Sequence, residues 1–149
     1  MLTSKIGRAQ RALDKQLASR WPETPRSGWL KAIREAIGMS GQQFANRLAV
    51  AWQSMDGLEK SEANGTVTLN TLRKAAEALD CRLVYALVPN APSLEALVNN
   101  RARQIALAAL SNVTQTMLLE GQASSEADLE QRIREYINDH VRDSDLWAN

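Results

Sequence analysis

Hydrophobic residues recur at helical spacing along most of the chain, and the clearest repeat lies between residues 40 and 59. Phe44 and Leu48 are four residues apart, so both lie on one face of a short helix. Met55 and Leu58 are three residues apart and share one face of a second helix. A compact apolar turn separates the two pairs and sets the predicted helices at a steep angle. This spacing predicts a helix-turn-helix, whose second helix normally enters the major groove of DNA.

Two more predicted helices flank this pair. Residues 29–37 and residues 69–79 both repeat apolar side chains at spacings of three and four. Gly38 stands where a helix C-cap belongs, and Ser40 stands where the N-cap of the next helix belongs. Few aromatic residues and many alanines and leucines also favour an all-helical protein over a β-sandwich.

One strand is predicted after these helices. Residues 82–88 are rich in β-forming side chains, and Pro89 ends the run. A lone strand leaves its backbone unpaired, so we expect it to pair with the same strand of a second copy. The predicted dimerisation residues are Leu83, Tyr85 and Leu87. The resulting homodimer would match a palindromic operator with half-sites about one DNA turn apart. Pairing with the edge of a different protein is the alternative.

The chain resembles a known family in this region. Residues 29–80 resemble the lambda-repressor-like (Xre-type) helix-turn-helix domains. The stretch that continues through Arg82-Leu83-Val84-Tyr85-Ala86-Leu87-Val88-Pro89 is similar to the family called mobile mystery protein A, whose members are encoded beside a Fic-domain protein. The resemblance covers most of the chain. It implies an all-α fold, namely a lambda-repressor-like helix-turn-helix domain with one short β-strand and a C-terminal helical extension. It also implies operator DNA and a Fic-domain toxin as partners.

The resemblance further implies which residues face DNA. In lambda-repressor-like domains these residues stand at the start of each short helix. Carried over to this chain, Gln42 and Gln43 begin the first helix. Trp52, Gln53 and Asp56 would face the groove from the second helix. Glutamine can pair bidentately with adenine, and the backbone amides at a helix N-terminus suit a phosphate.

Other features of the same region strengthen or weaken this expectation. Arg47 and Lys60 are predicted phosphate contacts. Ala51 stands where the family usually has a capping serine, Trp52 is bulky, and Asp56 brings a negative charge near the phosphates. These departures leave three alternatives open: weak or altered DNA binding, binding that requires dimerisation, or a module that serves association alone.

The apolar spacing in residues 3–20 predicts an amphipathic helix before the helix-turn-helix. Its apolar face would carry Ile6, Ala9, Leu13 and Leu17. A single acid, Asp14, is opposed by five basic residues: Lys5, Arg8, Arg11, Lys15 and Arg20. Two interpretations of the basic face stay open. The helix is either an arm that reaches DNA phosphates or the acidic surface of a partner, or it covers the core and its basic face is simply solvated. The prolines in residues 21–25 end this helix and begin a linker.

A long helix is predicted from residue 94 to about Glu120, ended by Gly121. Thr116 and Glu120 are four residues apart and therefore project from the same face. Thr116-x-x-x-Glu120-Gly121 matches the inhibitory motif of Fic proteins, Ser/Thr-x-x-x-Glu-Gly/Asn. The alternative is a helix end with a solvated glutamate and a glycine C-cap. After it, Ser125 with Asp128 predicts the capping box of a last helix.

The Fic motif implies a mechanism. In such systems an inhibitory helix docks beside the Fic active site, and the hydroxyl residue anchors it. The glutamate pairs with an arginine that would otherwise hold the γ-phosphate of ATP. A carboxylate satisfies a guanidinium bidentately, as a phosphate would, and repels the nucleotide. Transfer of AMP to target hydroxyls would then stop.

We assign the 149 residues to three regions: 1–25, 26–91 and 92–149. Charged residues are divided unevenly between the first part of the chain and the C-terminal part. Residues 1–92 hold thirteen lysines and arginines against eight acids, a balance of +5. Residues 93–149 hold five against nine, a balance of −4. This division suits a DNA-facing first part and a C-terminal part that does not touch DNA.

Several functional classes are not expected. Cys81 is the only cysteine and His140 the only histidine, so neither a disulfide framework nor a zinc site is predicted. Cys81 is expected to be a buried structural thiol. No catalytic constellation or phosphate-cradling glycine loop is present, so we expect no enzyme activity and no cofactor. No apolar run reaches about 18 residues and no signal peptide opens the chain, so a cytoplasmic protein is expected.

The favoured interpretation is an antitoxin that inhibits a Fic adenylyltransferase in trans and represses its own operon. The first alternative is a DNA-binding repressor whose C-terminal helices only dimerise. The second is an interaction protein whose helix-turn-helix has lost DNA binding.

Overall fold

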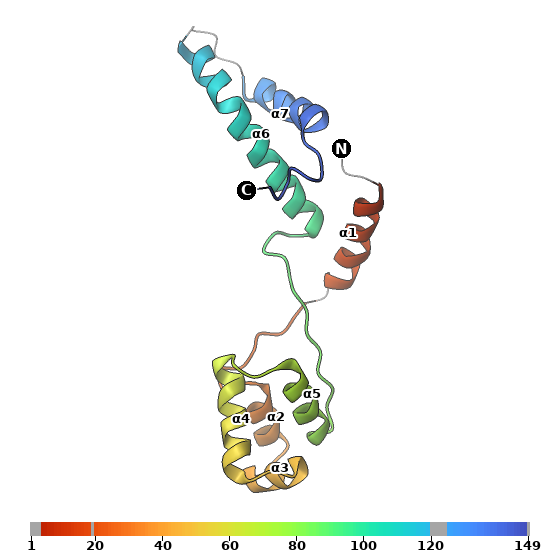
Figure 1. The fold of residues 1–149 in the computed structure, drawn as a ribbon, viewed down its shortest axis with the longest axis vertical. Coiled ribbons are helices and arrows are strands. Elements are labelled where there is room, and N and C mark those ends of the chain that lie inside the picture. Colours follow the sequence, from red (N-terminus) through yellow and green to blue (C-terminus); the bar gives the residue numbers. More distant parts are fainter. Residues whose placement is uncertain (1–3, 19, 120–124, 149) are drawn as a thin grey trace. The chain divides into compact units, whose positions relative to one another are not determined.

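The computed structural model describes residues 4–18, 20–119 and 125–148. Over these residues the chain forms helices alone, with no strand (Figure 1). The helices are α1 (Ser4–Leu17), α2 (Trp29–Ala36), α3 (Gly41–Leu48), α4 (Trp52–Asn64), α5 (Leu69–Ala78), α6 (Leu94–Leu119) and α7 (Glu126–His140). The predicted all-α class is therefore confirmed for the part of the chain that the structure describes.

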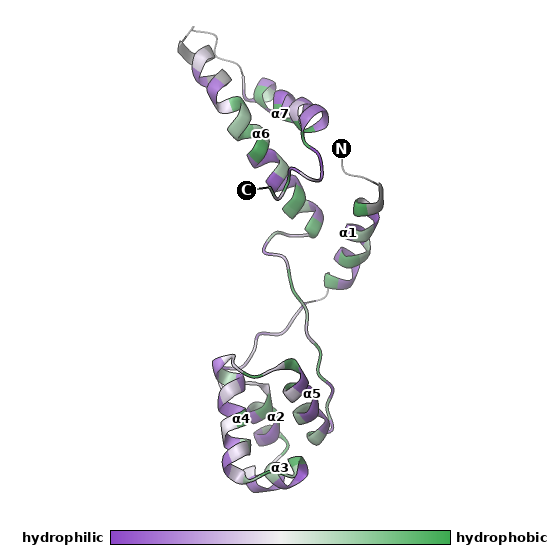
Figure 2. Cartoon of the chain, viewed as in Figure 1, coloured by the Kyte–Doolittle hydropathy of each residue, from purple (hydrophilic) through white to green (hydrophobic). Residues whose placement is uncertain are grey.

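The chain divides into two compact units. The central unit is Trp21–Ala86, with α2 to α5. The terminal unit joins Met1–Arg20 to Leu87–Asn149 and holds α1, α6 and α7. The N-terminal helix, which we placed in a separate region from the sequence, thus belongs to the same unit as the C-terminal helices. In Figure 2, hydrophobic and hydrophilic residues share single helices in both units, as expected for helices with one buried face.

The core of the central unit is built from the apolar positions that recur at helical spacing. Its buried members are Leu30, Phe44, Ala45, Met55, Ala75 and Leu79. Helix α3 packs on α4 and α5, and α2 packs on α4. Phe44 and Met55 are among the largest fully buried side chains, and burial of each contributes about 1.5–3 kcal/mol. The predicted spacing therefore identifies the buried faces of α3 and α4 correctly.

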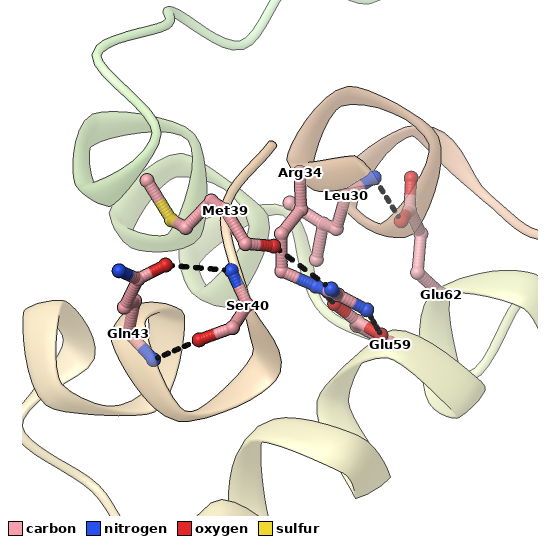
Figure 3. Close-up of polar contacts among 7 residues, drawn as sticks. All are labelled: Leu30, Arg34, Met39, Ser40, Gln43, Glu59 and Glu62. Carbon is pink, nitrogen blue, oxygen red and sulfur yellow. Dashed lines mark hydrogen bonds and ion pairs between the residues drawn. The ribbon is translucent and has the colours of Figure 1, made fainter. Parts of the chain in front are cut away.

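A buried ion pair joins α2 to α4 beside this core (Figure 3). The Nε of Arg34 donates to Oε1 of Glu59 at 2.5 Å, and its Nη2 donates to Oε2 at 3.1 Å. The Nη1 of Arg34 also donates to the carbonyl of Met39 at 3.1 Å. The hydrogen bond to Glu59 raises the pKa of the Arg34 guanidinium. The Glu59 side chain is only 6% exposed, so water cannot solvate its charge. Each charge of the pair is therefore stabilised by its partner.

A second carboxylate of α4 holds the beginning of α2. Glu62 accepts hydrogen bonds from the backbone amides of Trp29, at 2.8 Å, and Leu30, at 2.9 Å. Figure 3 shows the contact with Leu30. The N-cap residue, Gly28, has φ of 82° and makes no side-chain cap. A Cβ at Gly28 would lie 2.6 Å from Oε2 of Glu62, so only glycine fits both the backbone and the carboxylate.

In the terminal unit, α6 packs against both α1 and α7. The Asp14 carboxylate of α1 accepts from the amides of Leu94, at 2.7 Å, and Glu95, at 3.3 Å, at the beginning of α6. A carboxylate is favourable there because it satisfies free amides and complements the helix dipole. Between α6 and α7, Arg103 and Glu130 form an ion pair, which raises the pKa of Arg103 and lowers that of Glu130.

The orientation of α1 differs from the sequence expectation. Ile6 and Leu13 of its apolar face remain 37% and 48% exposed. Gln10 is buried and Asp14 half-buried instead. The bonds of Asp14 to the amides of α6 account for this orientation, because they place the Asp14 side of the helix toward α6.

The predicted strand is not formed within one chain. Residues 81–89 are neither helix nor strand, and the amides of residues 82–88 donate to no described backbone carbonyl. Because the prediction was pairing with a second copy, the strand and the homodimer stay predictions. Cys81 is exposed, so the expectation of a buried thiol is wrong. The sulfur still lies 3.4 Å from the carbonyl of Leu79.

Candidate nucleic-acid interface

The turn between α3 and α4 is organised by backbone geometry. Ala49, the C-cap of α3, has φ of 55°, in the left-handed region that costs alanine about 1–2 kcal/mol. The amide of Val50 donates back to the carbonyl of Ala45 at 3.1 Å and closes the end of α3. The chain then extends through Ala51 and enters α4 at Trp52. Two short helices are thus joined by three residues.

The beginning of α4 is open. Ala51 occupies its N-cap and offers no side-chain acceptor. The amides of Trp52 and Gln53 have no acceptor in the described part of the chain. Both side chains are exposed, Trp52 at 46%. Gly41 leaves room for the Trp52 indole, because a Cβ there would lie 2.9 Å from its Nε1. Two free donors and two exposed side chains therefore stand together.

Gln42 and Gln43 of α3, which were predicted to face DNA, make different contacts. Ser40 and Gln43 form a capping box: the Gln43 amide donates to Oγ of Ser40 at 3.2 Å, and the Ser40 amide donates to Oε1 of Gln43 at 2.8 Å (Figure 3). The N-cap predicted at Ser40 is confirmed. The Gln43 side chain is therefore used within α3. Gln42 is exposed and donates to Oδ1 of Asn46 at 2.9 Å.

The predicted phosphate contacts and the acid near them are already paired. Lys60 and Asp56 form an ion pair of 2.6 Å within α4. Arg47 donates to the carbonyl of Ala78 at 2.5 Å and to the carboxylate of Asp80 at 2.9 Å. Such exposed pairs contribute about 0–1 kcal/mol, so a phosphate can compete for either cation.

The charge of the central unit is smaller than the sequence division suggested. Trp21–Ala86 holds eight lysines and arginines against seven acids, a net charge of +1. The excess of +5 counted over residues 1–92 came largely from the N-terminal helix, which belongs to the terminal unit. The central unit therefore lacks the strong positive field typical of DNA-binding domains.

The three predicted dimerisation residues lie on the extended segment after α5. Leu83 is half-buried, whereas Tyr85 is exposed and Leu87 is 89% exposed. Leu83 helps to line an apolar pocket of about 240 Å³, together with Trp29 and Ile33 of α2. Exposed large apolar side chains beside an unpaired backbone are features of an edge that pairs with another chain.

The predicted Fic-inhibitory residues fall at the end of α6. Thr116 is exposed in the last turn, and its Oγ1 donates to the carbonyl of Asn112 at 2.9 Å. Glu120 and Gly121 lie outside the described residues. The predicted helix over residues 94–120 agrees with α6 to within one residue.

Comparisons with family models, with curated proteins and with solved structures find no match to this chain. The resemblance to mobile mystery protein A and to lambda-repressor-like domains therefore rests on the residues and spacings themselves. Among the described residues, no helix is long and apolar enough to cross a membrane. No group of three or more metal-ligating side chains occurs in that part of the chain either.

Proposed function

We propose that this protein is a DNA-binding antitoxin, which represses its own operon and inhibits a Fic-domain adenylyltransferase. In this proposal α2–α5 act as a lambda-repressor-like helix-turn-helix domain, with α4 as the recognition helix. The observation that carries the proposal is the open beginning of α4, where free amides stand beside the exposed Trp52 and Gln53. An uncapped N-terminus with adjacent polar and aromatic side chains suits a phosphate and a base edge.

Each group at this site has a role in DNA recognition. The amides of Trp52 and Gln53 bind a phosphate and fix the register of α4. The Gln53 side chain reads adenine through its N6 and N7 atoms, and Trp52 contacts a thymine methyl group. Arg47 and Lys60 exchange their carboxylate partners for phosphates. This exchange is favourable because the competing carboxylates, Asp80 and Asp56, belong to exposed surface pairs.

Replacing Gln53 with alanine is expected to weaken operator binding by about 1–3 kcal/mol, roughly 5- to 150-fold, because a bidentate base contact is lost. Fluorescence anisotropy with duplex DNA from upstream of the gene measures this change. Asn64→Ala, at the opposite end of the same helix, is the matched control and should bind like wild type. Equal operator affinity for Gln53→Ala and wild type would contradict the placement of α4 in the groove.

The proposed homodimer uses the extended segment after α5. Antiparallel pairing of two copies about Tyr85 places Leu83 of one chain opposite Leu87 of the other, which gives an apolar cross-strand pair. The highly exposed Leu87 and the unpaired backbone of residues 82–88 support this arrangement. Two-fold symmetry presents two copies of α4 to a palindromic operator.

Leu87→Glu is therefore expected to shift the protein from dimer to monomer, since two carboxylates would enter an apolar pairing. Sedimentation velocity at micromolar concentration measures the shift. Leu107→Glu, on the exposed side of α6, adds the same charge elsewhere and should leave the dimer intact. A wild-type protein that sediments as a monomer would contradict the proposed homodimer.

The Fic-inhibitory half of the proposal rests on Thr116-x-x-x-Glu120-Gly121 and on the resemblance to a family with a Fic-domain neighbour. The exposure of Thr116 in the last turn of α6 supports it, because an inhibitory helix must present its anchor residue to a partner. Thr116 would anchor the helix beside the Fic active site. Glu120 would pair with the arginine that binds the γ-phosphate of ATP.

The two alternatives predict different behaviour. A repressor without Fic inhibition would bind its operator and leave AMP transfer by the Fic protein unchanged. An association module that has lost DNA would show negligible binding at all salt concentrations, because only phosphate contacts give steep salt dependence.

A further inference from the structure

Helix α1 carries a basic stripe, which we define as Arg8, Arg11 and Lys15. The spacings of three and four residues place all three on one face of the helix. Each side chain is exposed, and none forms an ion pair with any residue that the structure describes. The only acid of α1, Asp14, is engaged with the first amides of α6. The stripe therefore holds three exposed positive charges that form no ion pair with a described acid.

Three of the eight cations of the central unit are in a different state. Arg34, Arg47 and Lys60 are each paired with a carboxylate, and the unit has a net charge of only +1. Specific DNA binding commonly depends on several phosphate contacts that release counterions. Its other five cations, Arg26, Lys31, Arg73, Lys74 and Arg82, form no ion pair with a described residue and can supply some of these contacts. The basic stripe supplies three more on the same chain.

We propose that the basic stripe of α1 binds the phosphate backbone of operator DNA. This inference rests on the proposed function, since it adds sequence-independent contacts to an operator-binding protein. From Arg8 to Lys15 the helix rises about 10 Å, which is long enough to meet more than one phosphate. Arginine is well suited to this task because its planar fork matches a phosphate.

An acidic protein surface is the competing partner for these cations. Protein interfaces usually have an apolar core surrounded by polar residues. The exposed apolar residues of α1, Ile6 and Leu13, lie at a spacing of seven, on a different face from the stripe. Gly7 and Ala12, the neighbours of the stripe on its two flanks, offer little apolar area. A contact made by charge alone favours a polyanion over a protein surface.

The test compares full-length variants that lose equal charge. In Arg8→Gln/Lys15→Gln, two stripe cations are removed and helix propensity is kept. Arg134→Gln/Arg142→Gln removes two exposed arginines of the terminal unit outside the stripe. Affinity for the upstream duplex and for a random duplex of equal length is measured between 50 and 200 mM salt, conditions under which phosphate contacts are distinguished. Circular dichroism checks that each variant is folded.

The stripe variant should reduce the slope of log affinity against log salt by about 1.8, since each contact contributes about 0.9. It should weaken both duplexes by a similar factor, on the order of 10-fold or more at 100 mM salt. The control should keep the wild-type slope. If the wild type binds the duplexes and the stripe variant keeps the wild-type salt slope, the inference is overturned and the proposed function stands. A stripe variant that loses only its binding to the Fic protein would then show that the stripe contacts a protein. If the wild type binds neither duplex, both fail.

Discussion

Replacing Glu59 with alanine is expected to lower the free energy of unfolding of the central unit by about 3–5 kcal/mol. The substitution leaves the Arg34 guanidinium buried without its carboxylate, and burial of an unpaired charge is strongly unfavourable. The remaining bond from Arg34 to the carbonyl of Met39 compensates only in part. Urea denaturation followed by circular dichroism and tryptophan fluorescence measures the loss.

Two further variants identify its cause. Glu77→Ala removes an exposed glutamate of α5 and should change stability by less than about 0.5 kcal/mol. Arg34→Met/Glu59→Leu replaces both charges by apolar side chains and should recover most of the loss, because neither charge is then left unpaired. If Glu59→Ala alone unfolds at the same urea concentration as wild type, the ion pair does not stabilise the unit.

Gly28→Ala is expected to destabilise the central unit by about 2–3 kcal/mol. Part of this cost is the positive φ of 82°, which disfavours any residue with a Cβ. The other part is steric, since the new Cβ displaces the Glu62 carboxylate and uncaps the amides of Trp29 and Leu30. Thermal or urea denaturation measures the combined effect.

A double-mutant cycle separates the two parts. Once Glu62→Ala has removed the carboxylate, Gly28→Ala should cost only its backbone part. The double variant should therefore lose less free energy of unfolding than the sum of the losses in the two single variants. Gly57→Ala is the control: Gly57 is helical with open space around its Cβ position, and alanine there should stabilise by about 0.5–1 kcal/mol. Strict additivity of Gly28→Ala and Glu62→Ala would contradict the steric account.

Local features of this fold are predictable from the sequence. The apolar repeats identify the buried faces of α3 and α4, and short-range chemistry identifies helix beginnings. Ser40 and Ser125 cap α3 and α7, each through a capping box with the residue three positions later. These signals work because the interacting groups are separated by one helical turn.

Long-range polar contacts are not predictable in this way. Glu59 lies 25 residues from Arg34, Glu62 lies 32 from Leu30, and Asp14 lies 80 from Leu94. No spacing in the sequence records such partners. The bonds of Asp14 also explain why Ile6 and Leu13 are exposed, although the apolar face of α1 was expected to be covered. For the same reason, the sequence did not show that Arg47 pairs with Asp80, 33 residues away. Lys60 and Asp56 are four residues apart within α4, so their spacing itself indicates an ion pair.

The candidate site is predictable only in its outline. Trp52 and Gln53 follow from the position of α4, and both are exposed as expected. Gln43 was expected to face DNA, but its side-chain oxygen accepts the Ser40 amide in the capping box, a use that the Ser-x-x-Gln spacing itself signals.

The antitoxin account is tested most directly by AMP transfer. The Fic-domain protein that the proposal expects beside this gene is incubated with labelled ATP and its substrate, together with the wild type, Glu120→Gly or Glu120→Gln. Glu126→Gln, at the beginning of α7, is the control for removal of one carboxylate. The account predicts that wild type and control stop AMP transfer, whereas both Glu120 variants still bind the Fic protein and fail to stop it. Equal inhibition by all four proteins, or by none, would contradict the account and leave a DNA-binding repressor.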